Sequence, residues 1–430
     1  MLKIFKDAWK IADLRQKILY TLMIIVVFRI GSIIPVPYLD ATALQTMLAG
    51  AGSNNMLGYI DVLTGGAFSR ATIFALSISP YITSSIIIQL LTVAIPYLEK
   101  LSKEGEEGRK VLTKITRWVT VALGLIQAAG YYALLKKQGA VTHTSGFSGV
   151  FSMVVILLTF TAGTAFIMWL GERINEKGIG NGISIILFAG IVSRGPAIVS
   201  KLYLYAQKEG TSSYIKIPLI VIMFLAIVVF VVWMTNAERR IPILYAKRVV
   251  GRKMYGGQSS HMPIKVNMSG VMPIIFASSL LAIPSTIQMF VDPKASTWFG
   301  KFLAVFNFNS WLYAAITFIL IIGFSYFYVS IQYNPIEMAN NLRKSNGTIP
   351  GIRPGKPTSD FIARVMNKIT FVGALFLGFM AILPFVVGKF TGMQLGIGGT
   401  TILIVVGVAL DTVKQMESLM MMRHYKGFLV

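Results

Sequence analysis

Long apolar segments with few charges constrain this chain more than any other feature, because a helix needs about 20 mainly apolar residues to cross a bilayer. Only 13% of the 430 residues are charged, about half the fraction typical of a soluble domain. The sequence therefore predicts an all-α polytopic membrane protein with ten transmembrane helices. The expected spans lie near residues 18–37, 71–98, 118–135, 150–171, 179–200, 217–236, 269–291, 308–331, 369–388 and 395–412.

The basic residues are unevenly distributed between the two sides of the membrane that ten spans define. An even number of spans places both termini on one side, and 29 of the 40 Lys and Arg residues fall on that side. Because basic loops are retained in the cytoplasm, we expect a multi-pass protein of the plasma membrane with cytoplasmic termini. The long basic loops 236–268 and 333–368 are expected on the cytoplasmic side as well.

Residue types that carry enzyme chemistry are scarce. The chain has no cysteine, which excludes a thiolate metal site and a cysteine nucleophile, and its histidines, His143, His261 and His424, are scattered. We therefore expect neither an enzyme nor a cofactor or metal ion. The acidic residues lie in loops or at span ends, apart from Asp61, in a short apolar stretch, to which no role is assigned. This scarcity disfavours an ion-coupled transporter, which needs ionisable groups inside its spans.

The glycine-rich run from Gly178 to Gly182 is interpreted as the start of a helix. It follows a loop and not a strand, so it does not match a phosphate-binding motif. We expect a turn that lets the fifth span begin close to a neighbouring helix.

The second and seventh spans resemble each other. Residues 79–87 are similar to residues 272–280, and residues 182–184 are more faintly similar to residues 399–401. Each partner lies five spans further along the chain, and an odd number of crossings reverses direction. Two inverted halves with a functional cavity between them would produce this pattern.

Both of the stronger motifs carry a proline, Pro80 and Pro273, at matching positions. Proline inside a helix removes a backbone hydrogen bond and permits a bend. We expect a kink at each proline, which would suit two facing helices that separate.

Several longer motifs resemble the bacterial SecY family, whose members are channel subunits of the Sec protein translocase. The resemblance runs from end to end and includes both long basic loops. Its motifs are GGAFSR at 65–70, ISPYITSSIIIQLL at 78–91, GIGNGIS at 178–184, YAKR at 245–248, IKVN at 264–267 and PGIRPG at 350–355.

The resemblance implies a clamshell whose halves, 18–210 and 211–415, face each other across an hourglass pore, with a cytoplasmic amphipathic N-terminus (1–17) and a cytoplasmic tail (416–430). It also implies a constricting ring of aliphatic side chains. A narrow apolar constriction dewets and so resists ion flow. The matching positions are Ile78, Ile82, Ile183, Leu187, Ile275 and Ile404, of which Leu187 departs from an all-isoleucine pattern.

The resemblance further implies a plug, a short helix that seals the outer funnel, and a lateral gate between spans 2 and 7. The plug matches residues near 55–66, which are too few to span a bilayer. Its residues would be Asn55, Met56, Leu57, Gly58, Tyr59, Ile60, Asp61, Val62, Leu63, Thr64 and Gly65. The gate would include Pro80, Thr83, Ser84, Pro273, Ser279 and Ile283.

The two basic loops carry more positive charge than retention in the cytoplasm requires, which indicates partners. In the family that the chain resembles, these loops contact the SecA ATPase and the ribosome, and clustered Arg and Lys residues suit a phosphate-rich RNA surface. The resemblance alone adds SecE and SecG, translocating polypeptides with their signal sequences, and membrane lipids as partners. The expected contact residues are Arg239, Arg240, Lys247, Arg248, Arg252, Arg343, Lys344, Arg353 and Lys356, with Arg353 foremost.

The function favoured by the resemblance is a passive channel that translocates unfolded secretory polypeptides and releases transmembrane segments sideways into lipid, driven by SecA or the ribosome. An inverted-repeat transporter of small solutes is the main alternative, and a membrane scaffold without conduction is a third. Cross-linking between the expected ring and a stalled polypeptide would distinguish them.

Overall fold

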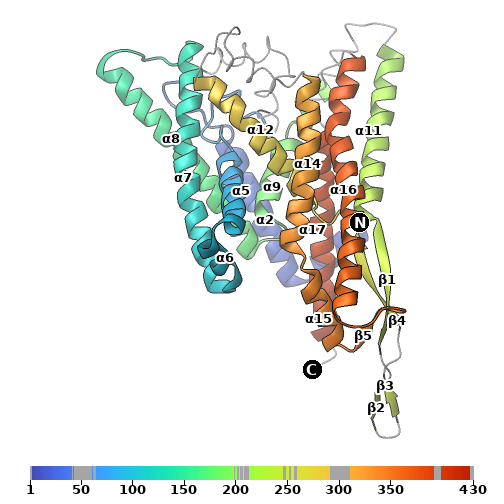
Figure 1. Ribbon diagram of the computed structural model, residues 1–430. Coiled ribbons are helices and arrows are strands. Elements are labelled where there is room, and N and C mark those ends of the chain that lie inside the picture. Colours follow the sequence, from blue (N-terminus) through green and yellow to red (C-terminus); the bar gives the residue numbers. More distant parts are fainter. Residues whose placement is uncertain are drawn as a thin grey trace.

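The computed structural model describes residues 2–40, 42, 61, 64–197, 199–200, 203, 207, 213–245, 248–250, 253–255, 259–290, 310–391 and 399–426. Helices dominate these residues (Figure 1). They are α1 (Leu2–Lys10), α2 (Ala12–Gly31), α5 (Ser79–Ala94), α6 (Pro96–Lys103), α7 (Glu106–Lys137), α8 (Gly146–Lys177), α9 (Gly182–Val192), α11 (Ser213–Asn236), α12 (Met272–Phe290), α14 (Trp311–Gln332), α15 (Pro335–Lys344), α16 (Lys356–Thr391) and α17 (Gly399–Lys426).

Several of these helices can cross a membrane. Within the described ranges, four stretches are long and apolar enough, namely Glu106–Lys137, Gly146–Lys177, Trp311–Lys344 and Lys356–Leu383. α5 and α6 qualify together as a fifth, with a bend of 102° between them. The expectation of a helical polytopic membrane protein is thereby confirmed, while the count of ten spans stays a prediction.

The second expected span, 71–98, is only partly helical. Residues 64–77, here called the turn segment, form successive turns before α5 begins. Ala71 and Ser77 have φ values of 47° and 51°, in the left-handed region that an α-helix cannot include. The Tyr131 hydroxyl of α7 donates a hydrogen bond of 2.5 Å to the Phe68 carbonyl oxygen and anchors the turn segment.

The expected kinks at Pro80 and Pro273 are wrong. Pro80 lies in the first turn of α5, and Pro273 is the second residue of α12. Proline removes no intrahelical hydrogen bond in the first turn, so it favours the start of a helix there and bends nothing. The two similar motifs therefore do the same thing, which is to begin a helix.

α5 and α12 pack against each other and run in opposite directions. α5 leads into α6 at the lower end of the molecule, whereas α12 follows a strand at that same end and runs away from it (Figure 1). In two inverted halves, corresponding spans must run in opposite directions.

A small antiparallel sheet joins the two long basic loops, which the all-α expectation did not include. β1 (Glu238–Tyr245) pairs with β4 (Ser259–Lys265) along its length, and β5 (Gly347–Thr348) pairs with the end of β1. A separate hairpin is formed by β2 (Arg248–Val250) and β3 (Lys253–Tyr255). Ile241, Ile243 and Ile264 of the sheet are buried in one cluster with residues of α15 and α16. The two loops thus form one folded unit beside α15 (Figure 1).

The glycine-rich run starts helix α9, as expected. The Asn181 side-chain oxygen accepts hydrogen bonds from the backbone N–H groups of Ile183 and Ser184, at 3.1 and 3.4 Å, which is an N-cap. A Cβ atom on Gly182 would lie 1.9 Å from the carbonyl oxygen of Gly171 in α8. The prediction of a close approach to a neighbouring helix is confirmed.

Candidate pore and gate

The six residues expected to form the ring belong to one large buried apolar cluster or pack against it. Five of them belong to one buried apolar cluster, and Ile183 is partly buried against it. They come from α5 with the residue before it, α9, α12 and α17, so both halves of the chain contribute. The exposed fractions of the five are between 1% and 8%: Ile78, Ile82, Leu187, Ile275 and Ile404.

All six side chains expected in the ring are aliphatic. Such side chains attract one another by dispersion and the hydrophobic effect, neither of which fixes a direction. Contacts of this kind hold the helices together without selecting a partner by hydrogen bonding. They also contain no group that could bind a metal ion or transfer a proton.

The residues expected at the gate belong to α5 and α12, and α12 packs against both α5 and α7. The Ser84 hydroxyl donates to the Thr116 carbonyl oxygen of α7 at 2.8 Å, so this side chain ties α5 to α7. The Thr83 hydroxyl donates to the Ser79 carbonyl oxygen of its own helix at 3.1 Å. On α12, Pro273 is buried, Ser279 is half-buried and Ile283 is 45% exposed.

Most of the expected plug lies outside the described residues, namely Asn55, Met56, Leu57, Gly58, Tyr59, Ile60, Val62 and Leu63. The described members are Asp61, Thr64 and Gly65. Asp61 and Thr64 are buried, and the Thr64 hydroxyl donates to the Asp61 carbonyl oxygen at 3.1 Å. These three residues precede and begin the turn segment that leads to α5.

The expected docking residues that the structure describes are exposed at the end of the molecule that carries the sheet. Arg239 and Arg240 lie on β1, and Arg240 forms an ion pair of 2.8 Å with Glu238. Exposed basic residues on and after α15 are Arg343, Lys344, Arg353 and Lys356. Lys247 and Arg252 lie outside the described residues, as does the side chain of Arg248.

Relatives identify the family. The family model described as SecY matches residues 72–413. The protein translocase subunit SecY of Streptomyces lividans is 44% identical over 441 aligned positions, which cover 100% of both chains. The chain belongs to the SecY family. Its relative in Thermotoga maritima, also a protein translocase subunit SecY, is 42% identical and is covered to 98% of its length.

Solved structures show that the fold is that of SecY-family channels. A protein conducting channel is 18% identical with a TM-score of 0.62, and a SecY protein studied for its plug domain is 20% identical with a TM-score of 0.60. Sec61 in a canine ribosome–channel complex is 17% identical with a TM-score of 0.57. Each covers 94% of this chain, and each is covered to 92% of its own length.

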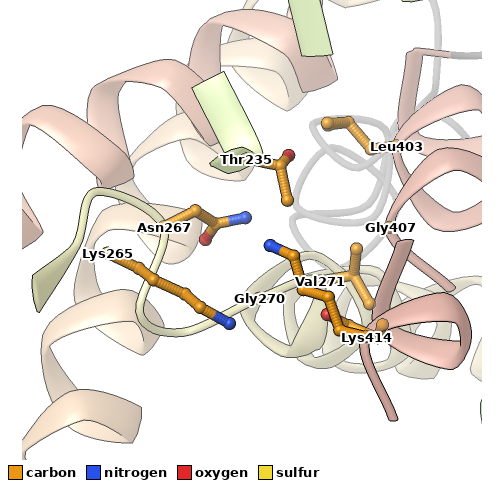
Figure 2. Close-up of a pocket in the computed structure, with 9 residues that line it drawn as sticks. Thr235, Lys265, Asn267, Gly270, Val271, Leu403, Gly407 and Lys414 are labelled. Carbon is orange, nitrogen blue, oxygen red and sulfur yellow. The ribbon is translucent and has the colours of Figure 1, made fainter. Parts of the chain in front are cut away.

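The sequence interpretation missed a small polar cavity of about 20 Å³ in this SecY-family chain, which is room for a single water molecule. It lies between the link from β4 to α12 and the helix α17 (Figure 2). The Asn267 side-chain oxygen there is buried and has no hydrogen-bond partner among the residues that the structure describes. The lining residues are Thr235, Lys265, Asn267, Gly270, Val271, Leu403, Gly407, Asp411 and Lys414.

A second cluster escaped the sequence interpretation, because it joins residues far apart in the chain. Asp61 forms an ion pair with Arg194, which follows α9. The only signal in the sequence was that Asp61, Arg29 and Arg194 are charged residues in apolar surroundings, where an ionisable group normally needs a partner.

Proposed function

We propose that this chain is the channel-forming subunit of a protein translocase, which conducts unfolded polypeptides passively between its two halves. One observation carries the proposal in particular. Six aliphatic side chains, from four helices and the residue before one of them, belong to or pack against one buried cluster that both halves share in a SecY-family fold.

An aliphatic ring suits this function for two physical reasons. A narrow apolar constriction is poorly wetted, so it opposes ion flow while no polypeptide is present. Aliphatic side chains also make no directional demands on what they contact. A chain of any sequence can therefore pass while the ring residues close around it.

The lateral gate is proposed to lie between α5 and α12, which pack against each other. An apolar signal sequence or transmembrane segment gains free energy when its side chains leave water. Separation of these two helices would give such a segment a path from the pore into lipid. The pair consists of corresponding spans, the second of each half, so their movement would also separate the two halves, 18–210 and 211–415.

The basic surface on the sheet and α15 is proposed to bind the partners that drive translocation. The ribosome is one candidate, because a structural neighbour is Sec61 in a ribosome–channel complex and exposed Arg and Lys residues bind phosphate groups. SecA is a second candidate for the same surface. SecE and SecG are proposed as further subunits of the complex.

The chain is proposed to lie in the plasma membrane with both termini and the sheet in the cytoplasm. The distribution of 29 basic residues against 11 supports this orientation. The sheet, α6 and the end of α17 lie toward one end of the molecule (Figure 1). Segments that share the cytoplasmic side should lie at one end in this way.

Cysteine cross-linking tests the proposal without background, because the chain has no cysteine of its own. Ile82→Cys and Ile275→Cys place a thiol in the ring, and Leu158→Cys on α8, 60% exposed on the outer surface, is the matched control. We expect a stalled secretory chain to cross-link to both ring positions and not to the control. Cross-links at Leu158→Cys alone would contradict the channel, and none at any position would favour a scaffold or a small-solute transporter.

A further inference from the structure

Asp61 is a buried carboxylate with several bonding partners. Its residue is 8% exposed. One carboxylate oxygen accepts a hydrogen bond of 2.8 Å from the backbone N–H of Ser69, and the other pairs with the Arg194 guanidinium. Its carbonyl oxygen accepts from the N–H of Gly66 at 2.8 Å and from Arg194 at 3.3 Å. Asp61 thus attaches the start of the turn segment to Arg194, which lies just after the end of α9.

The same two chain segments approach too closely for a side chain. Gly65 and Gly66 have φ values of 67° and 89°, which favour glycine. A Cβ atom on Gly65 would lie 2.8 Å from the Gly190 carbonyl oxygen and 2.7 Å from the Ser193 hydroxyl. The turn therefore rests directly on the backbone at the end of α9, and the ion pair lies beside this contact.

Positive charge exceeds negative charge around the contact. Arg29 of α2 also reaches it, because its Nη1 atom would lie 2.8 Å from a Cβ on Gly65. That nitrogen and the Nε of Arg194 are buried without hydrogen-bond partners among the described residues. Asp61 pairs with Arg194, and Arg29 lies beside the same contact, so the Asp61 carboxylate is the negative charge of the ion pair next to two arginines.

We infer that Asp61 and Arg194 are positioning residues that hold the turn segment and the end of the expected plug on α9, and so set how readily the channel accepts a substrate. We call this pair the clasp. The inference rests on the proposed function. Arg194 follows Leu187 of the ring by seven positions, roughly two helical turns, so the clasp fixes the end of a helix that also contributes to the ring.

The consequence for substrates follows from population shift. If the clasp exists only in the closed state, its free energy adds to what a signal sequence must supply to open the channel. A weaker clasp raises the open population without any substrate, and weakly apolar signal sequences then suffice. Asp61 and Arg194 thus determine selectivity without touching the ring.

The test has two readouts. One is export of a reporter with a weakened signal sequence, and the other is ion leakage of vesicles that hold the complete complex. Asp61→Asn leaves the Arg194 guanidinium without its carboxylate, so we expect export to rise by about tenfold or more, because a buried ion pair that loses one partner is strongly destabilised. Arg194→Gln should act less, about threefold, because the Asp61 carboxylate keeps its hydrogen bond from the backbone N–H of Ser69. Arg194→Lys, which keeps the charge, should restore most of the selectivity.

Asp40→Asn is the matched control. Asp40 is exposed and accepts hydrogen bonds from Thr42 at 2.7 and 2.9 Å, which hold the pKa of its carboxyl below the usual range. Its replacement therefore also removes one negative charge, and it should change neither readout.

Two further outcomes decide between the clasp and the channel. Combining Asp61→Asn with Arg194→Gln should give an effect smaller than the sum of the two, because the residues act as a pair. Unchanged export and leakage in Asp61→Asn, with ring cross-links to a stalled chain intact, would overturn the clasp and leave the channel standing. Absence of ring cross-links in Ile82→Cys and Ile275→Cys variants that keep Asp61 and Arg194 would instead contradict the proposed function itself.

Discussion

Helix α9 makes two kinds of contact, and they differ in what they tolerate. Its middle contributes Leu187 to an aliphatic cluster in which no contact has a fixed direction. Its start is fixed by the Asn181 cap and by the close approach of Gly182 to α8. Just after its end, Arg194 forms the ion pair with Asp61. The cluster should accept changes of shape but not of polarity, whereas the ends should accept neither.

This difference matches two requirements of a channel for many substrates. The constriction must yield to any chain, so its contacts are best left unspecific. The helices that carry it must nevertheless return to one closed arrangement, which needs contacts that are made in only one geometry. Directional contacts at the ends of α9 allow non-directional contacts in its middle.

The largest effect is expected from a charge in the cluster. Leu187→Asp would place a carboxylate where the side chain is 4% exposed, and an unpaired charge there favours water in the constriction. We expect ion leakage of vesicles without substrate to rise by about an order of magnitude or more. Leu187→Ile, which matches the isoleucines at the other ring positions, should leave leakage near that of the unmodified protein. Equal leakage in the two variants would show that polarity does not govern the constriction.

A smaller effect is expected from one methyl group at the start of α9. Gly182→Ala would bring a Cβ to 1.9 Å from the Gly171 carbonyl oxygen, so α8 and α9 must move apart. Overpacking of this kind costs about 1–3 kcal/mol, and we expect a lower melting temperature of the purified complex. Gly195→Ala, where a Cβ meets nothing within 4 Å, is the control. A Gly182→Ala variant as stable as its control would contradict the requirement for a tight junction.

Three expected ring residues, Ile78, Ile82 and Ile183, lie in motifs that resemble the family, and the ring itself stays a prediction. The long helices were predictable because apolar length is itself the signal. The turn segment could not be predicted. Ala71 and Ser77 have left-handed backbone, which alanine and serine rarely adopt, so these residue types did not indicate it. Pro80 and Pro273 were assigned to helix interiors because an apolar run does not reveal where its helix begins.

Contacts between distant residues were the other omission. Asp61 and Arg194 are 133 positions apart, and β5 joins β1 from a different loop. Neither pairing follows from local pattern, because each depends on the helices that bring the segments together. A charge in apolar surroundings indicates that a partner exists but not which residue it is.

The smallest effect is expected at the proposed gate, where a hydrogen bond between two helices can be compared with one inside a helix. Ser84→Ala removes a hydrogen bond from α5 to α7, whereas Thr83→Val removes one within α5. Hydrogen bonds between membrane helices contribute about 0.6 kcal/mol on average, so Ser84→Ala should raise export of a weak signal sequence about two- to threefold. Thr83→Val should change it less, because the helix keeps its own backbone bonds. The reverse order would mean that the gate depends on the stiffness of α5 and not on its attachment to α7.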